Sequence, residues 1–250
     1  MNTGKFAALL AAFLVAGAAF ASGGNDIRME PAPINRLDLA SQQRGARTFV
    51  NYCLNCHTAK YMRYSQVAKD LALTEDELQQ NLMFTGTRIY DAMQSSMPPE
   101  QARLWFGNAP PDLSLIARSR DVDYVYTFLK SFYADPSRPS GANNALLANT
   151  GMPHVLAGLQ GPQRAVYEPR TNKEGKVVQV LVRVESTGPG EMSPAEFDGF
   201  VRDTVTFLEY VSEPAKSQRR SLGVWVILYL LMFTAFTYFL KKEYWKDVKA

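Results

Sequence analysis

Cysteine and histidine are scarce in this chain, which has 250 residues but only two of each. Both cysteines and one histidine fall in a single stretch, "CLNCH", from Cys53 to His57. A structural zinc site usually takes four ligands from two cysteine pairs, so the missing second pair argues against one. A disulfide or a thiol-redox motif would have no need of the histidine that follows directly. The cysteines and the histidine are therefore best interpreted together, as one motif.

Arginine is absent from the first 21 residues, which argues against a mitochondrial presequence, because such presequences are rich in arginine. Lys5 supplies a positive start, Phe6 to Phe20 is an apolar run, and Ala19-Phe20-Ala21 is an A-x-A cleavage pattern. The run is short for a membrane span. We predict that residues 1–21 are a secretion signal and that the mature protein begins near Ser22, outside a bacterial cytoplasm.

Charge is absent from a second stretch, the 19 residues from Leu222 to Leu240. A helix of that length spans about 28 Å, close to the thickness of a bilayer's hydrocarbon core. It would be apolar on every face, unlike the helices of a soluble domain of this size. We predict a transmembrane anchor with its flank at 216–241. The secretion signal would leave 22–215 as a periplasmic domain and 242–250 as a cytoplasmic tail.

A strong excess of positive charge is also missing. The formal net charge of the whole chain is +3, yet between Ser22 and Ala215 the 19 Lys and Arg residues are outnumbered by 22 Asp and Glu. Proteins that bind nucleic acid carry a basic patch or stripe, and none is evident here. We therefore predict no nucleic-acid partner.

The motif C-x-x-C-H is typical of covalent haem attachment. On a helical turn Cys53 and Cys56 stand about one turn apart, so their sulfurs can form thioethers to two neighbouring vinyl groups of one porphyrin. His57 follows immediately and can turn beneath the ring to bind the iron. The single motif predicts one covalently attached haem c, which leaves no free thiol for other chemistry.

The residues before the motif, 39–53, read as a helix. Gly45 and Phe49 stand one turn apart and resemble the first helix of cytochromes c, where a small residue lets a later helix cross closely. Glycine inside a helix costs about 1 kcal/mol, which makes a packing role attractive. The apolar residues expected near one face are Leu39, Ala46, Phe49, Val50 and Cys53.

Other signals outline a mainly α domain with insertions and one small β-hairpin. We predict a capped helix from Thr74, a helix over 121–133, a polar loop over 134–144 and a hairpin from about Val166 to Glu185. A last helix starts at "SPAE", with Ser193 as its cap, and ends near Pro214. Its apolar stripe contains Phe197, Phe200, Val201, Leu208 and Val211.

The residue on the other face of the iron decides the haem's chemistry. A methionine there is typical of an electron carrier, and an empty face is typical of a gas-binding or catalytic haem. Two methionines lie in loops that a following proline makes rigid, Met97 in "SSMPPE" and Met152 in "NTGMPHVL". Spacing from His57 does not choose between them.

Four stretches, in order along the chain from about Arg44 to the C-terminus, are similar to those of the cytochrome c1 family, the haem subunits of ubiquinol–cytochrome c reductase (the bc1 complex). The haem motif is common to many cytochromes, whereas "PPDLS", the late methionine and the terminal anchor together are more specific. The stretches are "RGARTFVNYCLNCH", "NAPPDLSLIARSRDVDYVYTFLKSFY", "GMPHVL" and "MSPAEFDGFVRDTVTFLEYVSEP".

The resemblance implies a set of haem contacts. It assigns the iron-ligating methionine to Met152, opposite His57, and leaves Met97 in a segment that supplies no ligand. His154 matches no ligand of the family, which implies that its side chain lies behind the iron ligands or at the surface. The region from Lys60 to Trp105 departs from the family pattern.

Other family positions fall near the haem periphery. Pro110 and Pro111 match a turn that lines the haem. Arg120 matches an arginine that meets a haem propionate, a charge-assisted contact. Tyr124 matches an aromatic residue beside the haem.

The function that this resemblance implies is electron transfer within a respiratory chain, in a bacterial inner membrane. The protein would receive electrons from a Rieske iron–sulfur protein, beside cytochrome b, and pass them to a soluble or anchored cytochrome c. It would not be an enzyme by itself. Two alternatives stay open: an anchored c-type cytochrome of another oxidoreductase, and a haem sensor with an open iron face.

Overall fold

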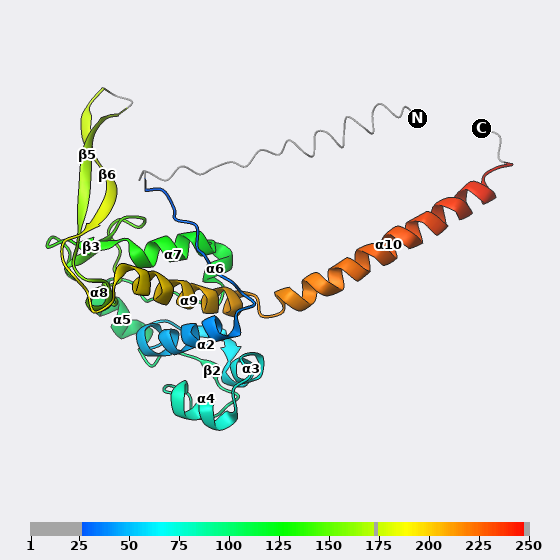
Figure 1. Cartoon of the computed structure of the whole chain (residues 1–250), viewed down its shortest axis with the longest axis horizontal. Coiled ribbons are helices and arrows are strands. Elements are labelled where there is room, and N and C mark those ends of the chain that lie inside the picture. Colours follow the sequence, from blue (N-terminus) through cyan, green and yellow to red (C-terminus); the bar gives the residue numbers. More distant parts are fainter. Residues whose placement is uncertain (1–26, 173–174, 248–250) are drawn as a thin grey trace.

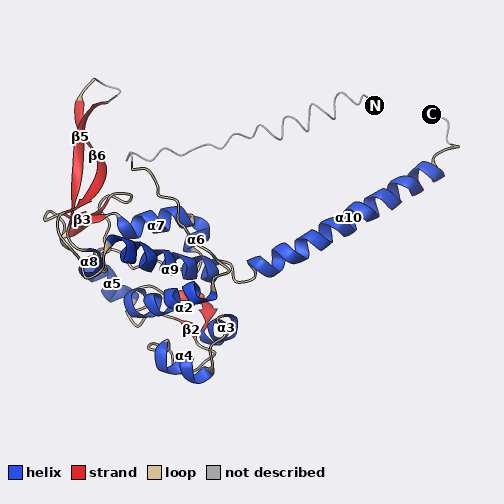
Figure 2. Cartoon of the chain, viewed as in Figure 1, coloured by secondary structure: helices blue, strands red, loops and turns tan. Residues whose placement is uncertain are grey.

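The computed structural model describes residues 27–172 and 175–247 (Figures 1 and 2). The predicted secretion signal, residues 1–21, lies outside the described residues. The helices are α2 (Leu39–Thr48), η1 (Phe49–Cys53), α3 (Tyr64–Asp70), α4 (Glu75–Asn81), α5 (Pro99–Phe106), α6 (Ile116–Ser119), α7 (Val122–Lys130), α8 (Ala157–Gln160), α9 (Pro194–Ser212) and α10 (Lys216–Tyr244). The strands are β1 (Ala59–Arg63), β2 (Ala92–Met93), β3 (Phe132–Ala134), β4 (Ala142–Asn144), β5 (Gln163–Thr171) and β6 (Val177–Ser186).

The helix α9 lies at the centre of the domain, with α2 and α7 beside it (Figure 1). Its predicted start is confirmed. The Ser193 hydroxyl accepts a hydrogen bond from the Glu196 amide, and the Glu196 carboxylate accepts one from the Ser193 amide. This reciprocal cap satisfies two amides that the helix end would otherwise leave unpaired. The predicted stripe is buried except for Phe200, which is half-buried.

The helices α2 and α9 cross at Gly45, as predicted. A Cβ atom on Gly45 would lie 2.0 Å from the Asp203 carbonyl oxygen and 2.7 Å from the Phe207 Cβ. No side chain fits in that space, so the two backbones touch. One turn further along, the rings of Phe49 and Phe207 pack with their centroids 5.6 Å apart. The crossing joins the start and the end of the domain into one core.

The helix predicted over 39–53 is not regular throughout. After Thr48 the turn widens into η1, where the Leu54 amide donates to the Phe49 carbonyl oxygen, five residues back, over 2.9 Å. Wide turns of this kind hold one extra residue and are frequent at functional sites. Here the wide turn ends at Cys53, the first residue of the haem motif.

The prediction that Leu39 lies on the buried face is wrong, because its side chain is 40% exposed. Polar residues take the buried positions at this end of α2. The Ser41 hydroxyl donates to the Asp203 carboxylate over 2.6 Å, and the Gln42 amide group donates to the Arg36 carbonyl oxygen over 2.5 Å. Hydrogen bonds therefore replace apolar contacts there.

The β structure is richer than predicted, so the expectation of a mainly α fold with one small hairpin is only partly confirmed. The expected hairpin is present as β5 and β6, an antiparallel pair that projects from the domain (Figure 2). Two further antiparallel pairs, β1 with β2 and β3 with β4, occur in the described part of the chain. Each sheet has two strands.

Two predicted boundaries between 121 and 144 are wrong. The helix α7 ends at Lys130, and Phe132 begins β3 instead of continuing the helix. The stretch expected to be a polar loop returns as β4, whose residues Asn143 and Asn144 are 6% and 1% exposed. Their side chains form internal hydrogen bonds, so polarity did not indicate exposure here.

The helix α10 extends away from the domain (Figure 1). Within it, Gln218–Tyr244 is the one stretch of the described residues that is long and apolar enough to cross a membrane. None of its most apolar window is buried against the rest of the protein. This arrangement fits the predicted C-terminal anchor.

Replacing Gly45 with alanine should weaken the crossing. The added methyl group must push α9 away, and overpacking of this kind typically costs about 1–3 kcal/mol of unfolding free energy. Gly199→Ala in α9 is the matched control, because its Cβ would meet nothing nearer than 3.7 Å, and it should raise stability slightly. Denaturant unfolding monitored by circular dichroism measures both. Equal midpoints for the two variants would contradict the close crossing.

Candidate haem site

The haem motif forms a tight turn that follows η1 without a loop between them. The amides of Cys56 and His57 both donate to the Cys53 carbonyl oxygen, over 3.0 and 2.8 Å. Leu54, between the cysteines, is fully buried and anchors the turn in the core. Both cysteines are free thiols and half-buried. The turn therefore presents two thiols and an imidazole within five residues.

The environment of the thiols does not favour thiol-redox chemistry. Burial raises the pKa of the Cys53 thiol to about 12 and also raises the pKa of Cys56 above its ordinary value. Thiols that exchange disulfides at neutral pH have a lowered pKa, because the thiolate is the reactive form. The structure thus agrees with the exclusion drawn from the motif.

The imidazole of His57 is oriented by a backbone group. Its Nδ1 lies 2.8 Å from the Pro111 carbonyl oxygen, and nearby the Leu113 amide donates to the Thr58 carbonyl oxygen over 2.7 Å. A ring that donates from Nδ1 keeps Nε2 free to bind a metal, an arrangement typical of metal-ligating histidines. Burial lowers the pKa of His57, although the bond to Pro111 opposes the shift.

Two residues that the sequence did not single out hold this arrangement together. One oxygen of the Asp112 carboxylate accepts from the Lys60 amide over 3.1 Å, and the other accepts from the Ser114 amide over 2.9 Å. The hydroxyl of Ser114, which is fully buried, accepts from the Tyr61 amide over 3.1 Å. The acidic residue after two prolines was the only local signal of this role. "PPDLS" therefore ties its segment to the residues that follow the haem motif.

Arg120 and Tyr124, both predicted near the haem periphery, lie together in the structure. The Arg120 guanidinium lies over the Tyr124 ring, 5.5 Å from its centroid. Between them Asp121 has a φ of +74°, unusual for a residue with a side chain, and its carboxylate accepts from the Val122 amide to cap α7. Arg120 is exposed and Tyr124 is half-buried.

Met152 is half-buried, on a segment that packs against the end of α5. The preceding Gly151 is so close to this helix that a Cβ would lie 2.5 Å from the Phe106 carbonyl oxygen. His154 stacks on the Phe132 ring, with centroids 4.9 Å apart and planes at 3°. Burial lowers the pKa of His154 to about 4, opposed by Gln160. His154 is thus a neutral packing residue at neutral pH.

Met97 occupies a different setting from Met152. Its amide donates to the Ser95 hydroxyl over 3.0 Å, and that hydroxyl donates to the Asn55 carbonyl oxygen over 2.6 Å. Asn55 lies between the two cysteines. The Met97 segment is therefore tethered to the attachment turn itself, whereas Met152 comes from a segment packed on α5.

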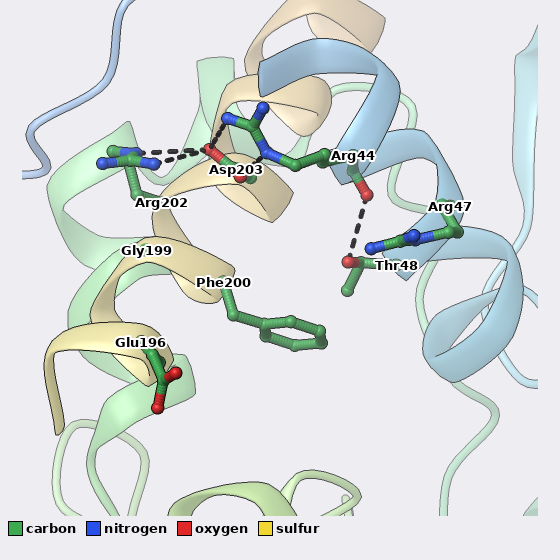
Figure 3. A pocket seen from close by; sticks show the side chains of 8 residues that line it. All are labelled: Arg44, Arg47, Thr48, Glu196, Gly199, Phe200, Arg202 and Asp203. Atoms are coloured by element: carbon green, nitrogen blue, oxygen red, sulfur yellow. Dashed lines mark hydrogen bonds and ion pairs between the residues drawn. The ribbon is translucent and has the colours of Figure 1, made fainter. Parts of the chain in front are cut away.

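A cleft of about 310 Å³ lies where α2 and α9 cross (Figure 3). Asp203 lies between two guanidinium groups at its edge and accepts from Arg44 over 2.5 Å and from Arg202 over 3.0 Å. Burial alone would raise the pKa of Asp203, but these bonds and that from Ser41 hold it below its ordinary value. The lining is Arg44, Arg47, Thr48, Glu196, Gly199, Phe200, Arg202 and Asp203, which includes no residue of the haem motif.

The donor set on the attachment turn fits a haem. Two free thiols on one turn can each add across a vinyl group, and the Nδ1 bond of His57 keeps Nε2 available for iron. Among the described residues no group of three or more Cys, His, Asp or Glu could hold a different metal ion. The residues present therefore favour haem over a zinc site.

Comparison with known proteins shows the family of this chain. The model of the Cytochrome C1 family matches residues 30–248, almost the whole described chain. The chain belongs to the cytochrome c1 family. It is 46% identical over 242 residues to cytochrome c1 of Allochromatium vinosum, which covers 96% of this chain and 98% of that protein.

Two further relatives, one with a different name and one more distant, also match most of the chain. A protein of Nitrosomonas europaea named ammonia monooxygenase gamma subunit is 44% identical over 240 residues, covering 96% of this chain and 97% of its own length. The mitochondrial cytochrome c1 haem protein of Kluyveromyces lactis is 25% identical over 236 residues, covering 87% and 74%. Similarity thus extends along nearly the entire sequence, beyond the haem motif.

Membership of this family establishes the general activity. The chain is a c-type cytochrome with a haem c cofactor, an electron-transfer subunit of the bc1 complex and not an enzyme by itself. It is associated with a membrane, in agreement with the apolar helix α10. These conclusions confirm the family and the kind of function that the sequence predicted.

Replacing Asp112 with alanine should loosen the segment behind the haem motif, because the amides of Lys60 and Ser114 lose their acceptors. Each lost bond to a charged acceptor typically costs about 1.5–3 kcal/mol of unfolding free energy. Asp112→Asn keeps one side-chain acceptor, and its loss should be smaller. Denaturant titration of the haem-loaded proteins measures their unfolding free energies. These should decrease from the wild type to Asp112→Asn to Asp112→Ala. If Asp112→Ala matches the wild type, the tie is not important for stability.

Proposed function

We propose that this chain carries one covalently attached haem c and passes electrons from a Rieske iron–sulfur protein to a cytochrome c. Cys53 and Cys56 would hold the haem through thioether bonds, and His57 and Met152 would bind its iron. Bound in this way, the haem supplies one-electron chemistry at its iron. The polypeptide supplies attachment, ligand orientation and a protein surface for its partners.

The hydrogen bond from His57 to Pro111 is the observation that carries this proposal. It orients the imidazole before iron binds and makes Nε2 the ligating atom. Because the carbonyl belongs to a segment tied to residues 58–61, the ring has a rigid support. A rigid ligand reorganises little when the iron changes its oxidation state, which suits a protein that relays single electrons.

The choice of Met152 over Met97 rests on the family resemblance and is supported by their surroundings. Met97 is tethered to Asn55 on the attachment turn through Ser95, on the same segment that carries His57. Met152 belongs to a separate segment, whose Gly151 packs on the end of α5. Met152 would therefore approach the haem independently of the segment that carries His57.

At the haem periphery we assign Arg120 to a propionate. Its guanidinium is held over the Tyr124 ring at 5.5 Å, which orients the charge and leaves its donors available. Tyr124 packs against the same core as Cys53, which supports a position beside the haem. Pro111 contributes its carbonyl group to His57 and lines the ring.

The chain is anchored by α10 with its haem domain in the periplasm, beside cytochrome b and the Rieske protein. Ion pairs support a defined junction between the domain and the anchor. The Glu209 carboxylate, at the end of α9, meets Lys216 over 2.8 Å and Arg36 over 3.0 Å. Since Glu209 is 8% exposed, these pairs are sheltered from solvent and hold the anchor's first turn to the domain.

A second candidate function comes from the Nitrosomonas relative named ammonia monooxygenase gamma subunit. Its identity to this chain is close to that of the Allochromatium cytochrome c1. An anchored c-type cytochrome that serves another oxidoreductase would use the same haem site and the same anchor. The partners that accompany the chain in the membrane therefore distinguish the two functions.

Met152→Ala should open the iron to external ligands and remove the methionine–iron charge-transfer band of the oxidised protein. The reduced variant should bind carbon monoxide, which the wild type should not. Met97→Ala is the matched control and should leave the band and the ligand behaviour unchanged. Optical spectra of the purified proteins show which variant loses the band. Loss of the band in the Met97 variant would move the ligand to Met97, and an open iron in the wild type would favour a haem sensor.

Purification of the affinity-tagged full chain from native membranes in mild detergent should retain cytochrome b and the Rieske protein. A chain with Glu209→Ala offers a sharper comparison, because a loosened junction should lower the yield of both partners without loss of covalent haem. Mass spectrometry of the eluted subunits measures the result. Recovery of a different oxidoreductase in place of cytochrome b would contradict the first proposal and favour the second.

A further inference from the structure

The segment that leads to Met152 contains two asparagines that are almost fully buried, Asn143 at 6% exposure and Asn144 at 1%. A buried amide is costly unless its donors and acceptor are paired. Both asparagines are paired, largely with backbone groups of their own loop. This pattern differs from the apolar packing of the helical core and points to a loop whose shape is specified by side-chain hydrogen bonds.

Asn144 fastens the loop to the end of α7. Its amide group donates to the Phe128 carbonyl oxygen over 2.8 Å. Its carbonyl oxygen accepts from the amides of Leu146 and Leu147, over 2.9 and 3.3 Å. The beginning of the loop is therefore bound to the core, and the chain is turned back immediately afterwards.

Asn143 closes the loop from start to end. Its side-chain oxygen accepts from the Asn144 amide over 2.9 Å and from the Asn149 amide over 2.8 Å. Its side-chain nitrogen donates to the Asp135 carboxylate over 2.9 Å. One side chain thus joins two backbone amides five residues apart and is itself bound to the neighbouring turn.

Asn149 is held from a second side. Its backbone has a φ of +62°, a left-handed conformation that asparagine tolerates better than most residues. The Arg138 guanidinium donates to the Asn149 side-chain oxygen over 3.3 Å and to its carbonyl oxygen over 3.1 Å. Because the Asn149 amide also donates to the Asn143 side chain, both peptide groups of Asn149 are hydrogen-bonded.

Two residues, Thr150 and Gly151, then separate this fixed point from Met152. Thr150 is buried, and its hydroxyl accepts from the Met152 amide over 3.3 Å. Gly151 packs directly on the Phe106 carbonyl oxygen. The backbone of Met152 is consequently held by contacts on each residue from Asn149 onward.

We propose that Asn143 is a positioning residue for Met152, whose side-chain amide sets the loop that presents the sulfur to the iron. This inference rests on the proposed function, in which Met152 is the axial ligand. The side chain must both accept and donate. Asparagine does so, whereas aspartate would lose the donor and place a second carboxylate against Asp135, and alanine would lose every bond.

The test uses the full-length, haem-loaded protein with Asn143→Ala and Asn143→Asp. Each variant should weaken the methionine–iron charge-transfer band and let the reduced protein bind carbon monoxide, which the wild type should not, since buried hydrogen bonds that shape the loop are lost. Covalent haem should stay at one per chain. Asn143→Asp is nearly isosteric, so it decides the question if the alanine variant fails to fold.

Leu78→Ala is the matched control, because Leu78 is fully buried in α4, an element that the haem site does not use. It should lower stability but leave the band and the carbon monoxide behaviour unchanged. If folded Asn143 variants keep the wild-type spectrum, or change only as Leu78→Ala does, the positioning role is refuted. If Met152→Ala keeps the band, the ligand assignment of the proposed function fails instead.

Discussion

The contact of α2 with α9 at Gly45 is the constraint on which the haem site depends. Two helices from opposite ends of the sequence approach until their backbones touch, and the Asp203 carboxylate beside the contact binds Ser41, Arg44 and Arg202. The haem motif follows α2 directly through one wide turn. The position of its thiols relative to the core is therefore set by the crossing and not by a flexible loop.

A second set of contacts orients the residues that we propose as iron ligands. The segment after Pro110 gives His57 its hydrogen-bond acceptor, while Asp112 and Ser114 bind the backbone of the residues behind it. In a separate segment, buried asparagines shape the loop before Met152. Both iron ligands that we propose thus come from segments fixed by hydrogen bonds to backbone groups. A site of this kind holds its ligands in place while the iron's charge changes.

Local signals in the sequence predicted the elements that local chemistry controls. The cap at Ser193, the cap at Thr74 and the small residue at the crossing were each correct, because residue type and spacing determine them. The wide turn η1 was not predicted, and the buried strand β4 was not predictable, since hydrogen bonds from its asparagines to Asp135 and Phe128 accompany its burial. "ADPSRPSGANN" has the composition of a solvent-exposed loop, and only the folded chain shows that its last asparagines are internal. For the site, the motif predicted the attachment residues. The loops of Met97 and Met152 had equally suitable sequences for an iron ligand, so local sequence did not choose between them.

The most direct test of the account is whether the haem stays on the polypeptide when the protein is denatured and extracted with acidified acetone. The full chain matured in a bacterial periplasm should keep one haem per polypeptide through this extraction, as measured by its pyridine haemochrome spectrum and intact mass. The double variant Cys53→Ser and Cys56→Ser should keep none. A wild-type chain that releases all of its haem, or that carries zinc in its place, would contradict the central claim.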